Sequence, residues 1–129
     1  MLALGGREKG WRVDVRPAVP GQRIRILLRD GAVGTSGVGE QFALIDGLRD
    51  GRVMDPRTGH PVRNVRSATV VAAEAADADA LSTAFLAGGA ALARSYCDAH
   101  PNTLAVLTMN DESATTAVFG AFDGATLLQ

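Results

Sequence analysis

Apolar and polar side chains alternate in two stretches near the start of the chain, residues 11–16 and 23–28. This period of two predicts strands with one buried face. The prolines and the glycine between the two stretches predict a turn, so we expect an antiparallel hairpin. Asp30–Gly31 predicts a second hairpin. Further strands are expected at residues 32–36, 42–45, 52–54 and 67–73, the last of which is continuously apolar and suited to the centre of a sheet.

The apolar spacing of residues 77–98 predicts one long helix, because Leu81, Phe85, Leu92 and Tyr96 recur near helical spacing. Gly88–Gly89 interrupts it, at a cost of roughly 1 kcal/mol per glycine relative to alanine. These small residues either let another backbone approach closely or mark a bend. His100–Pro101 should end the helix. A last hairpin is expected from strands at 103–109 and 114–119.

Strands, one long helix and then strands predict an α+β fold, a mainly antiparallel sheet with the helix on one face. We expect a single domain over residues 1–129. The net charge of −1 gives no electrostatic reason to expect nucleic acid as a partner. The single cysteine, Cys97, excludes an internal disulfide and is predicted to be buried and unreactive. We expect no signal peptide in residues 1–16, where charges and glycines interrupt the apolar run.

A first candidate site is Asp79–Thr83, at the start of the predicted helix. Residues four positions apart share a helix face, so the Asp79 carboxylate and the Thr83 hydroxyl could converge on one ion. Oxygen ligands suit Mg²⁺ or Ca²⁺, and a site with few protein ligands suits Mg²⁺ bridged to a phosphate. The alternative is that Asp77 or Asp79 caps the helix and complements its dipole.

Two other stretches could bind a ligand. Asp55-Pro-Arg-Thr-Gly59 has the composition of a tight turn, but Arg57 beside Thr58 could also hold a phosphate. Gly34-Thr-Ser-Gly37-Val-Gly39 could let a backbone lie against a ligand, or could be a bent strand. It matches neither the Walker loop nor the dinucleotide fingerprint.

In order and spacing, these stretches resemble the C-terminal half of the FAD:protein FMN transferases, the ApbE family. The matching elements are Thr-Ser-Gly (35–37), Asp-Pro-Arg-Thr-Gly (55–59), an apolar strand (67–73) and Ala-Asp-Ala-Leu-Ser-Thr (78–83). The resemblance extends across most of residues 11–119. It implies an ApbE-like lobe of the T-fold type.

The resemblance also implies an activity, in which the protein splits FAD and attaches FMN to a threonine of a target flavoprotein, releasing AMP. Mg²⁺ would be held on the pyrophosphate by Asp79 and Thr83, with Ser82 as a weaker hydroxyl ligand where some members have another aspartate. The residues implied at the flavin nucleotide site are Ser36, Gly37, Asp55, Arg57 and Thr58.

The chain differs from the family pattern in one residue and in length. Arg52 occupies the position where members commonly carry a histidine that assists the phosphoryl chemistry. Arginine stabilises phosphate charge but cannot act as a base near neutral pH, so Arg52 is the candidate catalytic residue in that electrostatic role. Members are roughly twice as long, which implies that residues 1–129 are one lobe of a two-lobed enzyme.

The missing half leaves two hypotheses open. In the first, the chain is a flavin transferase or its C-terminal portion, working with FAD, Mg²⁺ and an acceptor flavoprotein. In the second, it is a non-catalytic lobe that binds flavin nucleotides or assists assembly. In either case a companion N-terminal half or a homo-oligomer would cover the face that the second lobe normally covers. The family also implies a location in the cell envelope or periplasm.

Overall fold

A computed structural model describes residues 2–3, 11–15, 24–37, 42–45, 48–51, 65–110 and 115–128. Among these residues it contains one helix and three antiparallel sheets. The helix is α1 (Ala75–Ala99). The five-stranded sheet has the order β1 (Leu2–Ala3), β4 (Gly31–Gly37), β7 (Val65–Ala72), β8 (Thr103–Met109) and β9 (Thr116–Ala121). A three-stranded sheet has the order β10 (Ala125–Leu128), β3 (Ile24–Leu28) and β2 (Trp11–Val15), and β5 (Phe42–Ile45) pairs with β6 (Leu48–Gly51).

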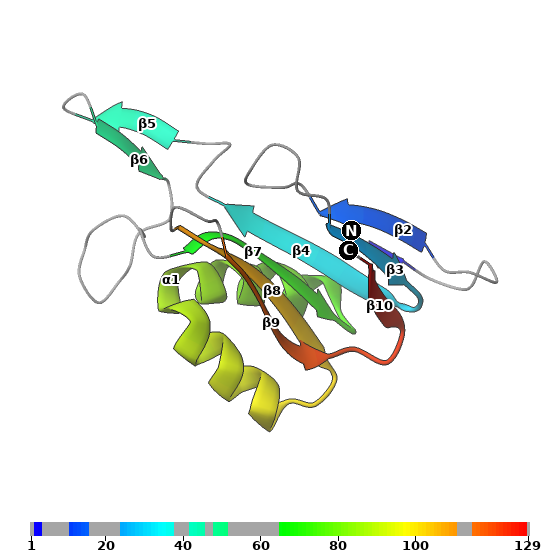
Figure 1. Cartoon of the computed structure of the whole chain (residues 1–129). Helices are drawn as coiled ribbons and strands as arrows, with labels where there is room; N and C mark the ends of the chain where they lie inside the picture. The colour runs from blue at the N-terminus through cyan, green and yellow to red at the C-terminus, as the bar shows by residue number, and fades with distance from the viewer. Residues whose placement is uncertain are drawn as a thin grey trace.

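The predicted α+β class and antiparallel pairing are confirmed, and the five-stranded sheet has β7 at its centre. Five consecutive residues of β7, 68–72, are buried, because neighbouring side chains alternate between two covered faces. Helix α1 covers one face, as predicted. The three-stranded sheet covers the other face, for which the sequence pattern had predicted no covering element (Figure 1).

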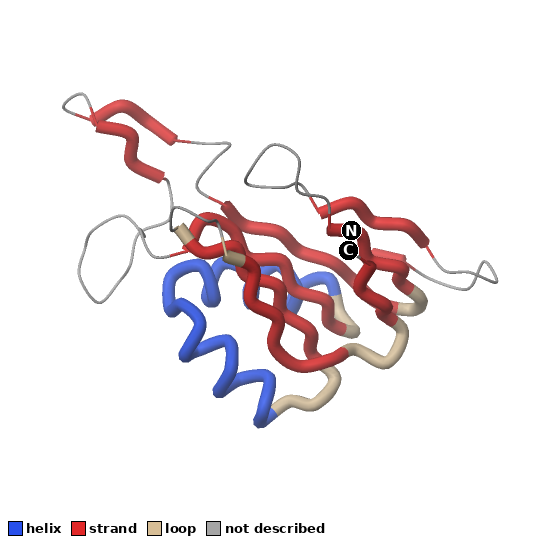
Figure 2. The backbone as a smooth tube through the Cα atoms, viewed as in Figure 1, coloured by secondary structure: helices blue, strands red, loops and turns tan. Residues whose placement is uncertain are grey.

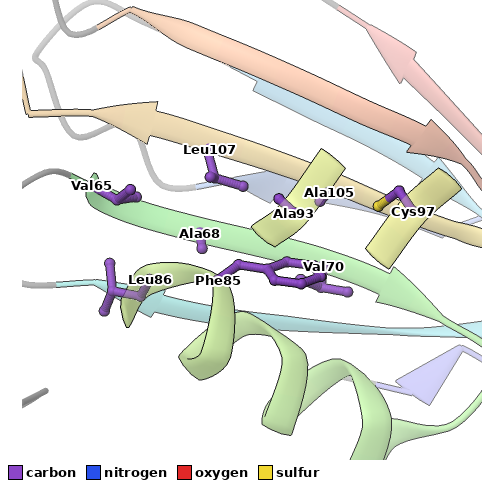
Figure 3. Close-up of a cluster of buried hydrophobic side chains, with 9 residues drawn as sticks. All are labelled: Val65, Ala68, Val70, Phe85, Leu86, Ala93, Cys97, Ala105 and Leu107. Atoms are coloured by element: carbon purple, nitrogen blue, oxygen red, sulfur yellow. The ribbon is translucent and has the colours of Figure 1, made fainter. Parts of the chain in front are cut away.

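The core therefore has two layers on either side of the five-stranded sheet. Figure 3 shows the layer under α1, where Phe85 and Leu86 of the helix pack on small and branched residues of β7 and β8. The opposite layer joins Ile24, Ile26 and Leu28 of β3 to Val33, Val71, Leu104, Val106 and Phe122. Burying a side chain the size of leucine or phenylalanine contributes roughly 1.5–3 kcal/mol, so both layers contribute substantially to stability.

The hairpin predicted at Asp30–Gly31 is wrong. Strand β3 pairs with β2 and β10, whereas β4 pairs with β1 and β7, so the turn carries the chain from one sheet to the other. Asp30 has a positive φ of 48°, which aspartate tolerates better than most residues. A Cβ at position 31 would lie 2.8 Å from the ring of Phe122, so glycine lets the turn press against the core.

Helix α1 is bent, as one of the two interpretations of Gly88–Gly89 predicted. Gly89 has φ 79° and ψ −169°, a conformation outside the helical region, and the helix continues on both sides of it (Figure 2). The two segments keep contact across the bend, since the rings of Phe85 and Tyr96 lie 5.6 Å apart in an edge-to-face arrangement. The bend lets one helix follow the twisted sheet from β4 toward β9.

Candidate functional site

The candidate site lies where the start of α1 crosses β4. Side chains on a strand alternate between its two faces, so Gly34 and Ser36 face the helix while Val33 and Thr35 face the second sheet. Thr35 accordingly pairs with buried Thr69, with their hydroxyl oxygens 3.1 Å apart. Of the two hydroxyls in the Thr-Ser-Gly stretch, only that of Ser36 belongs to the helix face.

Gly34 is the residue that lets the helix come this close. A Cβ built on Gly34 would lie 2.5 Å from the carbonyl oxygen of Ala78 and 2.9 Å from the backbone nitrogen of Asp79. Both atoms belong to the helix backbone and cannot rotate away. The glycine-rich stretch was expected to let a backbone lie against a ligand or to bend a strand. In the structure, residues 32–37 of β4 pair with β7 in continuous register, and the backbone that lies against Gly34 is that of α1.

Three hydroxyl groups meet beside this contact. The Ser36 oxygen lies 2.8 Å from the Ser82 oxygen and 3.1 Å from the Thr83 oxygen. Ser82 also donates to the backbone carbonyl of Asp79 at 2.9 Å, and Thr83 lies 3.4 Å from that carbonyl oxygen. Ser82 is completely buried, whereas Thr83 is exposed. The structure thus joins the Thr-Ser-Gly stretch and the Ala-Asp-Ala-Leu-Ser-Thr stretch at one point.

Asp79 is exposed and lies one helical turn before Thr83, on the same side of α1. The helix begins at Ala75 after Glu74, and the backbone N–H of Ala78 already donates to the carbonyl of Glu74. Asp79 therefore follows the first turn, where unpaired N–H groups need a cap. Asp77 does lie in that first turn, where a negative charge favours the helix dipole.

The remaining predicted site residues divide into two groups. Gly37 ends β4, is exposed, and has room for a Cβ at ordinary contact distances of 3.4 Å or more. Packing within the described residues therefore does not explain a glycine there. Arg52, Asp55, Arg57 and Thr58 lie outside the described residues, and their predicted roles stay predictions.

The donor atoms gathered here are one carboxylate and hydroxyl oxygens. Among the described residues, no three or more His, Cys, Asp or Glu side chains cluster as metal ligands. An oxygen-only set with a single carboxylate matches Mg²⁺, which binds through one or two carboxylates and completes its coordination with water and substrate phosphates. Asp79 and Thr83 fit that description. Ser82 fits it less well, because its buried hydroxyl is engaged by Ser36 and by the Asp79 carbonyl.

Comparison with known proteins identifies the class. The sequence profile of the ApbE family matches residues 1–108, and the chain belongs to the ApbE family. It is 41% identical over 78 residues to the FAD:protein FMN transferase of Treponema pallidum, covering 57% of this chain and 22% of that protein. It is 28% identical over 125 residues to the FAD:protein FMN transferase of Vibrio cholerae, covering 87% and 37%.

Solved structures show the same fold. The ApbE protein from Thermotoga maritima superimposes with a TM-score of 0.73 at 32% identity, over 87% of this chain and 37% of that one. The flavin transferase ApbE from Vibrio cholerae gives 0.66 at 25% identity, over 87% and 36%. The matched part of the chain thus covers between 22% and 37% of the length of each of these relatives. Within the described part of the chain, no helix combines the length and apolar character needed to cross a bilayer.

Proposed function

We propose that this chain is the magnesium-binding portion of an FAD:protein FMN transferase, which transfers FMN from FAD to a threonine of a target flavoprotein. Family membership and the names of two relatives support this class of reaction. The observation that carries the proposal is the 3.1 Å approach of Ser36 to Thr83, residues 47 positions apart, beside exposed Asp79. Two stretches that match the family pattern form one polar surface.

In the proposed reaction, the acceptor threonine oxygen attacks the phosphorus of the FMN half of FAD. The new P–O ester bond forms as the pyrophosphate P–O bond breaks, AMP leaves with the bridging oxygen, and the proton of the acceptor hydroxyl passes to solvent water. A bound Mg²⁺ would neutralise charge on the pyrophosphate and the leaving phosphate. Asp79 and Thr83 would hold that ion, and exposed Gly37 would allow the nucleotide to pass close to the strand end.

The partners of this activity are FAD, the acceptor flavoprotein and a second lobe. The chain spans little more than a third of the Vibrio cholerae and Thermotoga maritima relatives, so we expect a companion N-terminal portion or another copy of the chain to complete the flavin pocket. Arg52, Asp55, Arg57 and Thr58 would contribute from the segment between β6 and β7. The family resemblance implies that this segment belongs to the nucleotide site.

The direct test is flavin transfer. The chain is incubated with FAD, Mg²⁺ and an acceptor flavoprotein, alone and together with the N-terminal portion of the Thermotoga maritima relative. Covalent flavin is then read by fluorescence of the denatured acceptor. We expect transfer in the reconstituted mixture, its loss on chelation, and its loss in Asp79→Asn. Ser95→Ala, at an exposed position in the second segment of α1, is the matched control and should transfer normally.

Two other outcomes are informative. Magnesium-dependent FAD binding by calorimetry without transfer in either mixture would favour the non-catalytic nucleotide-binding lobe. Absence of both binding and transfer would overturn the proposed function.

A further inference from the structure

The three hydroxyls beside α1 form a hydrogen-bonded chain with a definite direction. Each hydroxyl carries one hydrogen, whereas a backbone carbonyl can only accept. The contact of 2.9 Å between Ser82 and the Asp79 carbonyl therefore uses the Ser82 hydrogen. Ser82 has no second hydrogen for Ser36, so Ser36 donates across the 2.8 Å contact.

Counting hydroxyl hydrogens in the same way assigns the donor in the third contact, between Ser36 and Thr83. Ser36 has given its hydrogen to Ser82, so Thr83 must donate across the 3.1 Å contact to Ser36. The competing direction would send the Thr83 hydrogen to the Asp79 carbonyl, which is the longest of the four contacts at 3.4 Å. It would also leave a shorter contact without a hydrogen. Three hydrogens thus fill the three shorter contacts, in the order Thr83, Ser36, Ser82, carbonyl of Asp79.

This direction determines what Thr83 offers to solvent. A hydroxyl binds a cation through an oxygen lone pair, with its hydrogen turned away from the ion. Donation to Ser36 directs the Thr83 hydrogen toward the strand and leaves its lone pairs for other partners. A threonine in a helix ordinarily divides between two χ1 rotamers, because its hydroxyl can bond to carbonyls of the preceding turn. Ser36 gives one of these rotamers an additional partner.

We propose that Ser36 is a positioning residue. It accepts the Thr83 hydrogen and thereby fixes the Thr83 rotamer in which the oxygen lone pairs are presented on the helix face that also carries Asp79. Buried Ser82 anchors the chain by taking the Ser36 hydrogen and passing its own to the helix backbone. This role differs from direct contact with the nucleotide, which the family resemblance implied for Ser36. It rests on the proposed function for the ion site at Asp79 and Thr83.

The first measurement is Mn²⁺ affinity, with Mn²⁺ standing in for Mg²⁺ and free ion counted by electron paramagnetic resonance. Residues that orient metal ligands change affinity by roughly 10–100-fold when mutated, so we expect Ser36→Ala to bind about 10-fold more weakly. Ser36→Thr keeps the hydroxyl and suits a strand, and should restore affinity. Ser95→Ala should match the parent, and Asp79→Asn should abolish binding.

The second measurement needs no metal. Three-bond couplings to the Thr83 methyl carbon report its χ1 by nuclear magnetic resonance. We expect one rotamer in the parent and in Ser36→Thr, and averaging between rotamers in Ser36→Ala. A single unchanged rotamer in folded Ser36→Ala would overturn the inference, whatever the metal result.

The two proposals can fail separately. If the parent binds Mn²⁺ and Ser36→Ala binds equally well, the positioning role is wrong while the metal site stands. If Asp79→Asn leaves Mn²⁺ binding unchanged, or the parent binds none, the proposed metal site is wrong. The rotamer measurement then decides the role of Ser36 alone.

Discussion

The two ends of α1 both approach the central sheet at a glycine, but the cluster of serine and threonine hydroxyls lies at the first of them. At the start, Gly34 of β4 faces the backbone of Ala78. At the far end, Gly120 of β9 faces Cys97, and a Cβ there would lie 2.9 Å from the Cys97 Cβ. Close approach of a helix to a strand is therefore a packing device in this fold. It does not by itself mark a functional site.

The side chains around each contact make the difference. Beside Gly34 lie Ser36, Ser82 and Thr83, whose hydroxyls bond to one another and reach solvent at Thr83. Beside Gly120 lie buried Cys97 and the apolar layer of Figure 3. The first end can therefore offer oxygen atoms to a ligand. At the second end the Cys97 side chain is buried among apolar residues, and we call this the closed end of α1. Substitutions at the two ends should therefore separate stability from binding.

Gly120→Ala should give the largest loss of stability. Its φ of 72° strains any side chain, and the added Cβ would lie 2.1 Å from the carbonyl oxygen of Thr103. Backbone strain of about 1–3 kcal/mol and overpacking of about 1–3 kcal/mol together predict a loss of about 2–6 kcal/mol in the free energy of unfolding. Urea unfolding followed by circular dichroism measures it. A loss below about 1 kcal/mol would show that the close contact at this end is absent in solution.

Gly34→Ala and Gly37→Ala form a matched pair on one strand. The Gly34 Cβ would meet helix backbone at 2.5 Å, whereas the Gly37 Cβ would have no contact under 3.4 Å. We expect Gly34→Ala to cost about 2–3 kcal/mol and Gly37→Ala less than about 0.5 kcal/mol by the same unfolding assay. Equal effects would contradict the helix approach. If Gly37→Ala is stable yet weakens FAD binding, the glycine serves the ligand.

Gly89→Ala tests the bend that lets α1 reach both ends. Nothing lies within 4 Å of a Cβ there, so only the conformation, with φ 79°, opposes the change. A conformation reserved for glycine predicts a loss of about 2 kcal/mol. The sign of the change in the free energy of unfolding is informative. A glycine with ordinary helical φ and ψ would gain about 0.4–1 kcal/mol of stability when replaced by alanine. A gain on urea unfolding would show that the helix is straight in solution.

Local elements of this fold were predictable, because each carries its own periodicity. The strand at 103–109 has the predicted bounds, and the helix and the central strand differ from prediction by only one or two residues at each end. The pairing of β3 with β10 was not predictable, since the alternation of residues 24–28 would suit any partner. The hairpin prediction at Asp30–Gly31 was wrong for a similar reason, because the same turn residues suit both a hairpin and a connection between two sheets.

The site was predictable only in part. Helical spacing alone places Asp79 and Thr83 on one face. The proximity of Ser36 to Thr83 depends on how a strand and a helix 47 residues apart pack together, and no local pattern encodes that contact. Only the family resemblance brought the two stretches together. The reason for Gly34 was also hidden, because a glycine required by a neighbouring helix and one required by a ligand look identical in a sequence.

The closed end of the helix should show itself in the pH dependence of stability. Burial, followed by the charge of Asp98, raises the pKa of the Cys97 thiol. The thiol of the unfolded chain has a pKa of about 8.5. Below that pH the thiol is neutral in both the folded and the unfolded chain, so its ionisation does not lower the free energy of unfolding. As pH rises, the unfolded chain loses its proton first and the free energy of unfolding falls, by at most about 1.4 kcal/mol per pH unit for one group. The fall continues until the folded thiol also ionises.

Unfolding midpoints between pH 7.5 and 10 test this sign. Cys97→Ala removes the only thiol of the chain, so it should lower stability at every pH through the cavity it leaves and should flatten the decline above pH 8.5. Ser95→Ala, two residues away and exposed, should keep the decline of the parent. A decline that persists in Cys97→Ala would assign it to another group.

Slow alkylation of the native thiol by iodoacetamide near neutral pH, with fast alkylation in urea, would independently confirm that this end of α1 is closed.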